Sequence, residues 1–267
     1  MSSLGIREVF MALKIDADLF LFDLDGTVYL GDTPIEGAID TLKKLTALGK
    51  KVCFLTNNSS KDKKEYVRKI SSMGYPVDLW QIITSTMATI RYLHTRRPGK
   101  SVFPVGTPSF VEELKKSRIP LSEDADIFLL AFDTTLTYEK IWKGNILLEK
   151  GREFFATHPD IVCPSDIGDM PDVGAMMTMF ESSSGRAPSV ICGKPYAPMA
   201  EIIESLFDIP KDRTVMIGDR LYTDILFGVN NGYQSVLVLS GETTHEMYID
   251  SGIHPTMVLP AISAMFD

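Results

Sequence analysis

Short, continuous runs of apolar residues recur along the chain, and polar residues follow most of them. The runs cover residues 19–22, 52–55, 214–217 and 235–239. Strands of a parallel sheet are buried on both faces, so they read as continuous apolar runs rather than as an alternation. The pattern therefore predicts four strands of a parallel sheet, of which 235–239 would be the last.

Helical spacing separates these runs. Between the first two, apolar residues recur at intervals of three and four positions: Ile35, Ile39, Leu42 and Leu45. Gly49 follows, as is typical of a helix end. Near the C-terminus a second apolar helix face follows Pro198, and a further helix is predicted from Asp224 to Val229. Strand, helix and strand in this order predict βαβ units, and hence an α/β fold with a Rossmann-like, doubly wound parallel sheet.

A different block lies between the two halves of this pattern. It has its own strand candidates at 102–105 and 127–130, and helix candidates from Phe110 to Lys116 and from Tyr138 to Glu149. We interpret residues 85–185 as a second α/β domain inserted into a core domain made of residues 1–84 and 186–267.

Composition and charge narrow the functional classes. The net charge of −8 argues against general nucleic-acid binding, which requires a basic face. The charge leaves small anionic substrates open, because local cations or a metal decide their binding. No apolar stretch approaches the roughly 20 residues that span a bilayer, and no leader pattern opens the chain. We expect a cytoplasmic protein without membrane contact.

Four polar clusters lie where predicted strands end or where the chain returns to the sheet. They are Asp23 with Asp25, Thr56 with Asn57 and Asn58, Lys194, and Asp219 with Asp224. Each has an ordinary interpretation when taken alone, namely a turn, a helix cap, a surface lysine and a helix-start acid. In an open parallel sheet, however, ligands bind at the carboxyl ends of the strands, so we expect the clusters to meet there.

Carboxylates that meet in one pocket repel each other unless a cation lies between them. A hard divalent ion such as Mg²⁺, bound by carboxylates, waters and substrate phosphate, resolves this repulsion. Phosphoryl transfer further needs a nucleophile, a proton donor and positive charge around the phosphoryl oxygens. The four clusters contain one candidate for each role.

The same clusters carry a family resemblance. The segments are Phe22-Asp23-Leu24-Asp25-Gly26-Thr27, Leu55-Thr56-Asn57-Asn58, Gly193-Lys194-Pro195 and Gly218-Asp219-Arg220-Leu221-Tyr222-Thr223-Asp224. They resemble, in order, the four motifs of the haloacid dehalogenase superfamily. The forms of the second and fourth motifs are similar to those of its nitrophenylphosphatase/NagD-like branch, subfamily IIA. The resemblance extends from about Leu19 to Gly241.

The resemblance implies a role for each residue. Asp23 would be the nucleophile that becomes phosphorylated, and Asp25 the group that protonates the leaving alcohol and later activates water. Lys194 would neutralise charge on the nucleophile and the phosphate. The remaining implied sites are Mg²⁺ ligands (Asp23, the backbone carbonyl of Asp25, Asp219 and Asp224) and phosphoryl contacts (Thr56, Asn57 and Asn58).

By the same resemblance the inserted block would be a cap that closes over the active site. The loop from His158 to Asp172 is expected to face the substrate, with Cys163, Asp169 and Asp172 as candidate contacts. A plain surface loop is an equally good interpretation for any one of them. Many relatives have a Pro-Gly-x-Gly pattern where this chain has Pro171-Asp172-Val173-Gly174, so Asp172 departs from the family.

The leading hypothesis is a Mg²⁺-dependent phosphatase of small phosphomonoesters such as a sugar phosphate or phosphoglycolate, active on p-nitrophenyl phosphate in vitro. Its partner would be a small phosphorylated metabolite, and a homodimer is an open possibility. A phosphomutase or phosphotransferase would share the first half-reaction. In a different class, a receiver-like signalling protein would carry a regulatory phosphate on Asp23.

Overall fold

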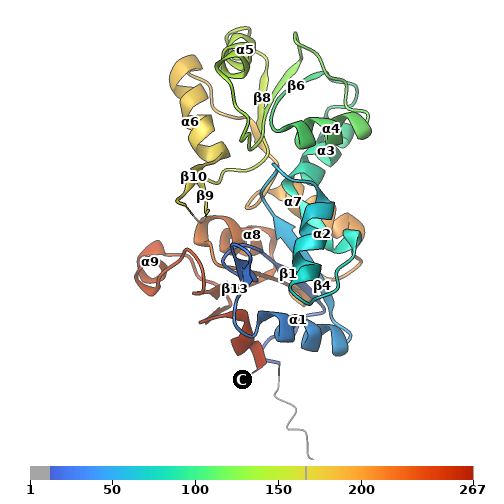
Figure 1. Ribbon diagram of the computed structural model, residues 1–267, viewed down its shortest axis with the longest axis vertical. Coiled ribbons are helices and arrows are strands. Elements are labelled where there is room, and N and C mark those ends of the chain that lie inside the picture. The colour runs from blue at the N-terminus through green and yellow to red at the C-terminus, as the bar shows by residue number, and fades with distance from the viewer. Residues whose placement is uncertain (1–12, 166, 267) are drawn as a thin grey trace, which may run out of the picture.

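The computed structural model describes residues 13–165 and 167–266. The first twelve residues of the predicted core domain, Asp166 of the predicted substrate-facing loop, and Asp267 lie outside the described residues. Two parallel sheets stand one above the other in Figure 1, with the second sheet and its helices in the upper half. The fold is α/β, as the apolar runs predict.

The lower sheet has six parallel strands in the order β14-β13-β12-β1-β4-β5. Their bounds are β1 (Leu19–Phe22), β4 (Lys51–Thr56), β5 (Ile82–Thr84), β12 (Thr214–Gly218), β13 (Gln234–Val238) and β14 (Met257–Leu259). The expectation that residues 235–239 form the last strand is wrong, because β14 pairs with β13 beyond it. We refer to this sheet and the helices on it as the core.

Helices cover both faces of the core sheet, because alternate residues of its strands point to opposite sides. On one face Phe20 and Phe22 of β1 belong to an apolar cluster with α1 (Ala38–Ala47) and α2 (Lys63–Ser72). On the other face Leu19 and Leu21 pack with residues of α3 (Ser85–Arg96), α7 (Ala197–Leu206) and α8 (Leu226–Asn231). The core is therefore doubly wound.

The upper sheet has four parallel strands in the order β11-β8-β7-β6. Their bounds are β6 (Val102–Val105), β7 (Ile127–Leu130), β8 (Glu153–Ala156) and β11 (Val190–Ile191), and the helices with them are α4 (Pro108–Lys116), α5 (Tyr138–Glu149) and α6 (Val173–Ser184). Because residues 102–191 lie between β5 and β12 in the chain, we call them the inserted unit. The predicted boundary at 185/186 falls before β11, which pairs with β8 in this sheet.

Helix α3 leads from the core into the inserted unit. Its Ala88 packs in the apolar cluster under the core sheet, and its Leu93 packs in a cluster with strands of the upper sheet. A hairpin of β9 (Val162–Cys163) and β10 (Met170–Pro171) descends from the inserted unit towards the core (Figure 1). This hairpin lies within the predicted substrate-facing loop.

The remaining elements are short. They are the hairpin β2 (Tyr29–Leu30) and β3 (Thr33–Pro34), helix α9 (His245–Ser251), and three 3₁₀ turns at Leu79–Gln81, Lys211–Arg213 and Ile262–Phe266. The helix predicted from Asp224 to Val229 instead begins as a π-helical turn over Leu221–Ile225, before α8. Within the described part of the chain, no helix combines the length and apolarity needed to cross a bilayer.

Candidate active site

The register of the core sheet brings three of the four polar clusters to one edge. Phe22 of β1 lies beside Phe54 of β4 on one side and Ile217 of β12 on the other. Since these strands are parallel, their carboxyl ends coincide, and the residues that follow them gather there. Asp23 and Asp219 are the first residues after β1 and β12, and Thr56 is the last residue of β4.

Lys194 reaches the same edge from the segment before α7. Its side chain is only 1% exposed, and Nζ lies 2.6 Å from Asp23 Oδ1 and 2.6 Å from Asp224 Oδ1. The ammonium also donates to the carbonyl oxygen of Leu55 at 3.2 Å. Burial lowers the pKa of Lys194, but the carboxylates of Asp224 and Asp23 outweigh it and raise the pKa above its ordinary value. Lys194 is therefore a permanently charged bridge between two acids.

The side chain of Asn57 holds the backbone of Lys194 in place. Asn57 Oδ1 accepts the Lys194 amide at 2.8 Å, and Asn57 Nδ2 donates to the Lys194 carbonyl at 3.1 Å. These bonds use the side chain of Asn57 for positioning. Only its backbone amide can then serve in the phosphoryl contact that the sequence implies.

Asp23, Asp219 and Asp224 form a cluster whose ligand atoms all lie within 4.8 Å of one another. Burial raises the pKa of Asp23 against the opposing charge of Lys194. Burial and the charge of Asp224 raise the pKa of Asp219 to about 7. One ammonium does not neutralise three buried carboxylates, so the cluster has capacity for a further cation.

The carboxylate of Asp219 has one free oxygen. Its Oδ2 accepts the Glu242 amide at 2.6 Å, whereas the buried Oδ1 has no hydrogen-bond partner among the described residues. Glycines surround this carboxylate closely: a Cβ at Gly26 would lie 2.3 Å from Asp219 Oδ2, and one at Gly241 2.0 Å from it. An orphaned oxygen in a cluster of carboxylates fits a hard divalent cation, so these residues fit Mg²⁺.

Asp25 is not a member of this acidic cluster. Burial raises its pKa, while Lys69, Lys61 and Arg220 oppose that rise. A raised pKa favours the protonated form of the carboxyl group, which a general acid requires. The raised pKa therefore fits the proton-donor role that the sequence implies for Asp25.

A small cavity of about 40 Å³ joins the predicted residues of both units. From the core it is lined by Asp23, Asp25, Thr56, Asn57 and Asn58. A local turn shapes this rim: Thr56 Oγ1 accepts the Asn58 amide at 3.2 Å, and Asn58 Oδ1 accepts the Ser60 amide at 2.9 Å. The cavity has room for only a few water-sized groups.

The inserted unit closes the other side of the cavity. Cys163 and Asp172, both candidates from the sequence, line it. Burial raises the pKa of Cys163 to about 12, so this thiol is neutral and not a nucleophile near pH 7. Asp169 is exposed and lines a separate groove of about 590 Å³ beside Asp25 and Asp219.

Comparison with known proteins assigns the family. A family model described as haloacid dehalogenase-like hydrolase matches residues 20–119, and one described as HAD-hydrolase-like matches residues 191–265. The chain is 31% identical over 245 residues to a 5'-nucleotidase of Bacillus subtilis, covering 91% of this chain and 95% of that protein. The chain belongs to the haloacid dehalogenase-like hydrolases.

Other relatives of this hydrolase are also phosphatases. It is 30% identical over 239 residues to an acid sugar phosphatase of Staphylococcus haemolyticus, covering 89% of this chain and 90% of that protein. The solved 4-nitrophenylphosphatase of Thermotoga maritima matches with a TM-score of 0.89 at 40% identity, covering 93% of this chain and 95% of that structure. The resemblance to the nitrophenylphosphatase/NagD-like branch is confirmed, and this haloacid dehalogenase-like hydrolase is a phosphoric monoester hydrolase.

Sequence reasoning missed two charged residues of the hydrolase that line the cavity, Asp160 and Arg220. Arg220 Nη1 lies 3.3 Å from Asp160 Oδ2, and Arg220 Nε lies 2.8 Å from Glu242 Oε2. The only signal was position, since Arg220 stands between Asp219 and Asp224, and Asp160 lies in the loop expected to face the substrate. The sequence positions of Asp160 and Arg220 give no indication that the two residues form an ion pair between the inserted unit and the core.

Proposed function

We propose that this phosphatase hydrolyses small phosphomonoesters through a phosphorylated Asp23, with Mg²⁺ as cofactor. One observation carries the proposal: the Lys194 ammonium joins Asp23 and Asp224 beside the orphaned Asp219 Oδ1, and Asp25 lines the same cavity as Asp23. Nucleophile, counter-charge, cation ligands and proton donor thus lie around one small space.

In the first step a carboxylate oxygen of Asp23 attacks phosphorus, and the bond from phosphorus to the ester oxygen breaks. Asp25 gives its proton to the departing alkoxide, which leaves as the alcohol. Lys194, already bonded to Asp23, holds the carboxylate in place and balances the charge that the phosphoryl group brings.

In the second step Asp25, now a carboxylate, takes a proton from water as that water attacks the phosphorus of phospho-Asp23. The bond between phosphorus and the Asp23 oxygen breaks, which releases phosphate and regenerates the carboxylate. Thr56 and the Asn57 amide line the cavity where the phosphoryl oxygens would bind. Asn58 lines the same cavity and is a further candidate contact.

Asp23, Asp219 and the backbone carbonyl of Asp25 would hold the metal ion. Asp224 would assist the metal ion directly or through water. Both of its oxygens already accept hydrogen bonds, Oδ1 from Lys194 Nζ and Oδ2 from the Arg220 amide at 3.1 Å. When bound, Mg²⁺ supplies positive charge against the phosphoryl oxygens and so lowers the repulsion between them and Asp23.

The substrate that we propose is a small phosphorylated metabolite, such as a sugar phosphate or phosphoglycolate. The phosphoryl cavity opens beside a groove of about 910 Å³ that is lined by acids, lysines and polar groups alike, including Asp25, Lys61 and Lys69. Such a mixed lining suits a polar leaving group. The inserted unit would act as the cap that excludes water during the first step.

A variant that separates the two steps tests the proposal. Nitrophenolate leaves without protonation, so Asp25→Asn should still phosphorylate Asp23 from p-nitrophenyl phosphate but hydrolyse it slowly. Mass spectrometry of the quenched enzyme, with Mg²⁺ present, should then find phosphate on Asp23. Asp23→Asn is the matched control and should carry none. Phosphate on another residue, or no phosphate release by the wild-type protein, would refute the mechanism.

A further inference from the structure

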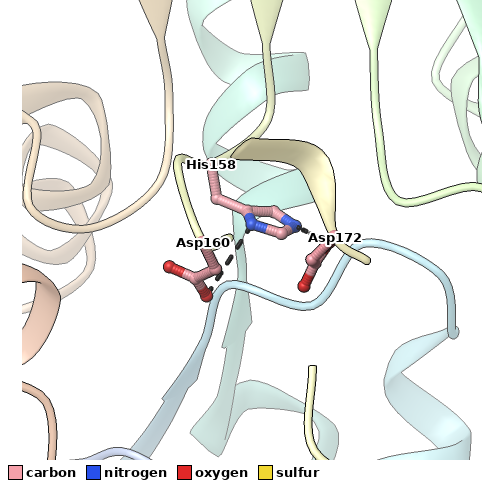
Figure 2. Close-up of side chains that lie close together, drawn as sticks. All are labelled: His158, Asp160 and Asp172. Carbon is pink, nitrogen blue, oxygen red and sulfur yellow. Dashed lines mark ion pairs between the residues drawn. The ribbon is translucent and has the colours of Figure 1, made fainter. Parts of the chain in front are cut away.

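A second buried cluster lies in the inserted unit, next to the active-site cavity. Figure 2 shows His158 between Asp160 and Asp172, with one ring nitrogen directed at each carboxylate. Nδ1 lies 3.7 Å from Asp160 Oδ2, and Nε2 lies 3.6 Å from Asp172 Oδ1. The imidazole is fully buried, and neither nitrogen has a hydrogen-bond partner within residues 13–165 and 167–266.

The number of protons that the cluster holds determines how many of its hydrogen bonds can form. A neutral imidazole has one N–H group, so it can donate to only one of the two carboxylates. Its other nitrogen then presents a lone pair to the second carboxylate, which is unfavourable in a buried site. Both contacts become hydrogen bonds only when the cluster holds one additional proton, either as an imidazolium or as a carboxylic acid.

Burial favours retention of that proton, and the neighbouring cations oppose it. Burial lowers the pKa of His158 and raises the pKa of Asp160 and of Asp172, so the three groups together resist the doubly negative state. Arg220 and Lys194 are the cations that face the cluster from the core. When groups interact this strongly, the proton belongs to the cluster rather than to a single residue.

A metal ion is a poorer solution for the same cluster. Arg220 Nη1 already lies 3.3 Å from Asp160 Oδ2, and its positive charge opposes a second cation there. The two carboxylates also lie at different nitrogens of the ring, and an imidazole binds a metal through one nitrogen. A shared proton, unlike a metal ion, does not require the three side chains to converge on one point.

The cluster is connected to the catalytic lysine. Asp160 Oδ1 accepts a hydrogen bond from Asn57 Nδ2 at 3.1 Å, and Asn57 holds both backbone groups of Lys194. The packing there is tight, because a Cβ at Gly193 would lie 2.5 Å from Asn57 Oδ1 and 3.0 Å from His158 Cβ. A displacement of Asp160 would therefore move Asn57 and, through it, Lys194.

We propose that His158 is a positioning residue whose shared proton joins Asp160 to Asp172. These contacts hold the two ends of the loop from His158 to Asp172 together beside the active-site cavity. His158 does not line the cavity; it acts through Asp160, which contacts the core, and Asp172, which forms part of the cavity wall. Loss of the shared proton releases one of the two contacts and loosens the loop. Phosphatase activity serves only as a readout of this role, so the identity of the nucleophile does not affect the inference.

Asp172→Asn separates this role from a merely structural one. Asp172 Oδ1 lies nearest to His158 Nε2 and also accepts the Val173 amide at 2.7 Å at the start of α6, so the new amide gives up the Val173 contact when its Nδ2 takes the place of Oδ1. In that orientation Nδ2 can donate to the neutral imidazole, whose N–H then remains for Asp160. Both contacts are satisfied without the additional proton, so the variant no longer needs it.

The measurement is kcat/KM for p-nitrophenyl phosphate, whose leaving group needs no proton from Asp25, from about pH 6 to about pH 10 at saturating Mg²⁺. Above the pKa of the cluster, the wild-type value should fall by about tenfold per pH unit. Asp172→Asn should lose this decrease, and His158→Asn should show a low, pH-independent kcat/KM because its amide satisfies only one carboxylate. Asp124→Asn removes an exposed acid of the inserted unit, 64% exposed, and should keep the wild-type pH dependence.

A second readout does not depend on turnover. In proton NMR the wild-type protein should show downfield, slowly exchanging N–H signals that disappear in His158→Asn and over the pH range where kcat/KM falls. In Asp172→Asn one such signal should persist to higher pH. Superimposable pH dependence in the wild type and Asp172→Asn, or a wild-type imidazole that exchanges rapidly at neutral pH, would overturn the proposal. Loss of turnover with these signals intact would instead contradict the proposed function.

Discussion

Two buried acidic clusters lie on either side of the active-site cavity, and they are satisfied in different ways. In the core, Asp23 and Asp224 share the Lys194 ammonium at 2.6 Å each, and Asp219 keeps one oxygen without a partner among the described residues. In the inserted unit, Asp160 and Asp172 flank an imidazole at 3.6–3.7 Å, and the orphaned atoms are the ring nitrogens. In the first cluster a carboxylate oxygen has no partner. In the second cluster the neutral imidazole has one N–H group too few for its two carboxylates.

The kind of orphaned atom indicates what each cluster binds. A carboxylate oxygen can only accept, so an unpartnered one among other acids fits a cation. An imidazole nitrogen can carry a proton, so an unpartnered one between two carboxylates fits proton binding. Burial makes both deficits costly, because water cannot fill them. Under the two proposals, these similar groups of acids would serve chemistry on one side and positioning on the other.

The largest effect on the core cluster is expected when its proposed nucleophile is removed. Asp23→Asn should lower kcat by at least about 10⁴-fold, because no phosphorylated intermediate can form. Steady-state turnover of p-nitrophenyl phosphate measures the loss, and circular dichroism checks that the fold is retained. Substantial residual kcat in a folded variant would show that another group attacks phosphorus.

Removing the shared ammonium tests how much the core cluster depends on it. Lys194→Met leaves the buried carboxylates of Asp23 and Asp224 without their common partner, so the free energy of unfolding in metal-free buffer should fall by about 3–5 kcal/mol. Lys143→Met is the control, because Lys143 pairs with Glu123 and Glu139 on the surface, where pairs contribute at most about 1 kcal/mol. Urea unfolding compares the two, and equal losses would refute a special role for Lys194.

The cation of the core cluster should compete with protons. Burial raises the pKa of Asp219 from 3.8 to about 7, so the metal-free folded state binds this proton more tightly than the unfolded chain does. The contribution of Asp219 to stability is therefore present at low pH and is lost as pH rises through this window. Mg²⁺ should raise the Tm more at about pH 8 than at about pH 5, and a chelator should abolish turnover.

Asp219→Asn supplies the control for that measurement, because it removes both the titrating group and a metal ligand. Its Tm should respond little to Mg²⁺ at either pH. An equal Mg²⁺-induced rise in the wild-type Tm at both pH values would contradict the assignment of Asp219 as the ligand with which protons compete.

The smallest change in stability is expected for the exposed charges around Asp18, at the opposite end of strand β1. Arg213 and then Lys50 lower the pKa of Asp18 through hydrogen bonds, so its contribution is present above the unfolded value of 3.8 and is lost as pH falls. Asp18→Asn should lower the Tm only slightly at neutral pH, less at high salt, and progressively less as pH falls below the unfolded value of 3.8. A larger loss than that of Lys194→Met would invert the expected order of buried and exposed charges.

Strands of the sheet and the polar residues at their ends could be predicted from the sequence because both follow short-range patterns. The apolar run at 19–22 became β1 without change, and residues 102–105 became β6. Asp23, Thr56 and Asp219 could be placed together because parallel strands end at one edge. By contrast, β14 and the π-helical turn at Leu221–Ile225 were missed, since a short strand and a local change of helix type leave little periodicity to detect.

The cap-side residues show the limit of such patterns. Asp160 lies two residues from His158, but the other partner, Asp172, comes from the far end of the same loop, at the start of α6, so no local spacing predicts the cluster. Arg220 meets Asp160 only because the inserted unit rests on the core. Contacts between units depend on how two separately folded surfaces meet, and no local spacing encodes that.

What the sequence alone determined is the class of enzyme: paired acids, a lysine and polar residues at the strand ends of an α/β sheet indicated phosphoryl transfer. The divalent cation stays a prediction. What only the tertiary structure decided is which atoms remain unsatisfied. Within the described part of the chain, Asp219 Oδ1 and the two nitrogens of His158 are buried and have no hydrogen-bond partner. Burial and distance, which are properties of the folded chain, are the grounds on which we propose a metal site in one acidic cluster and a site for a proton in the other.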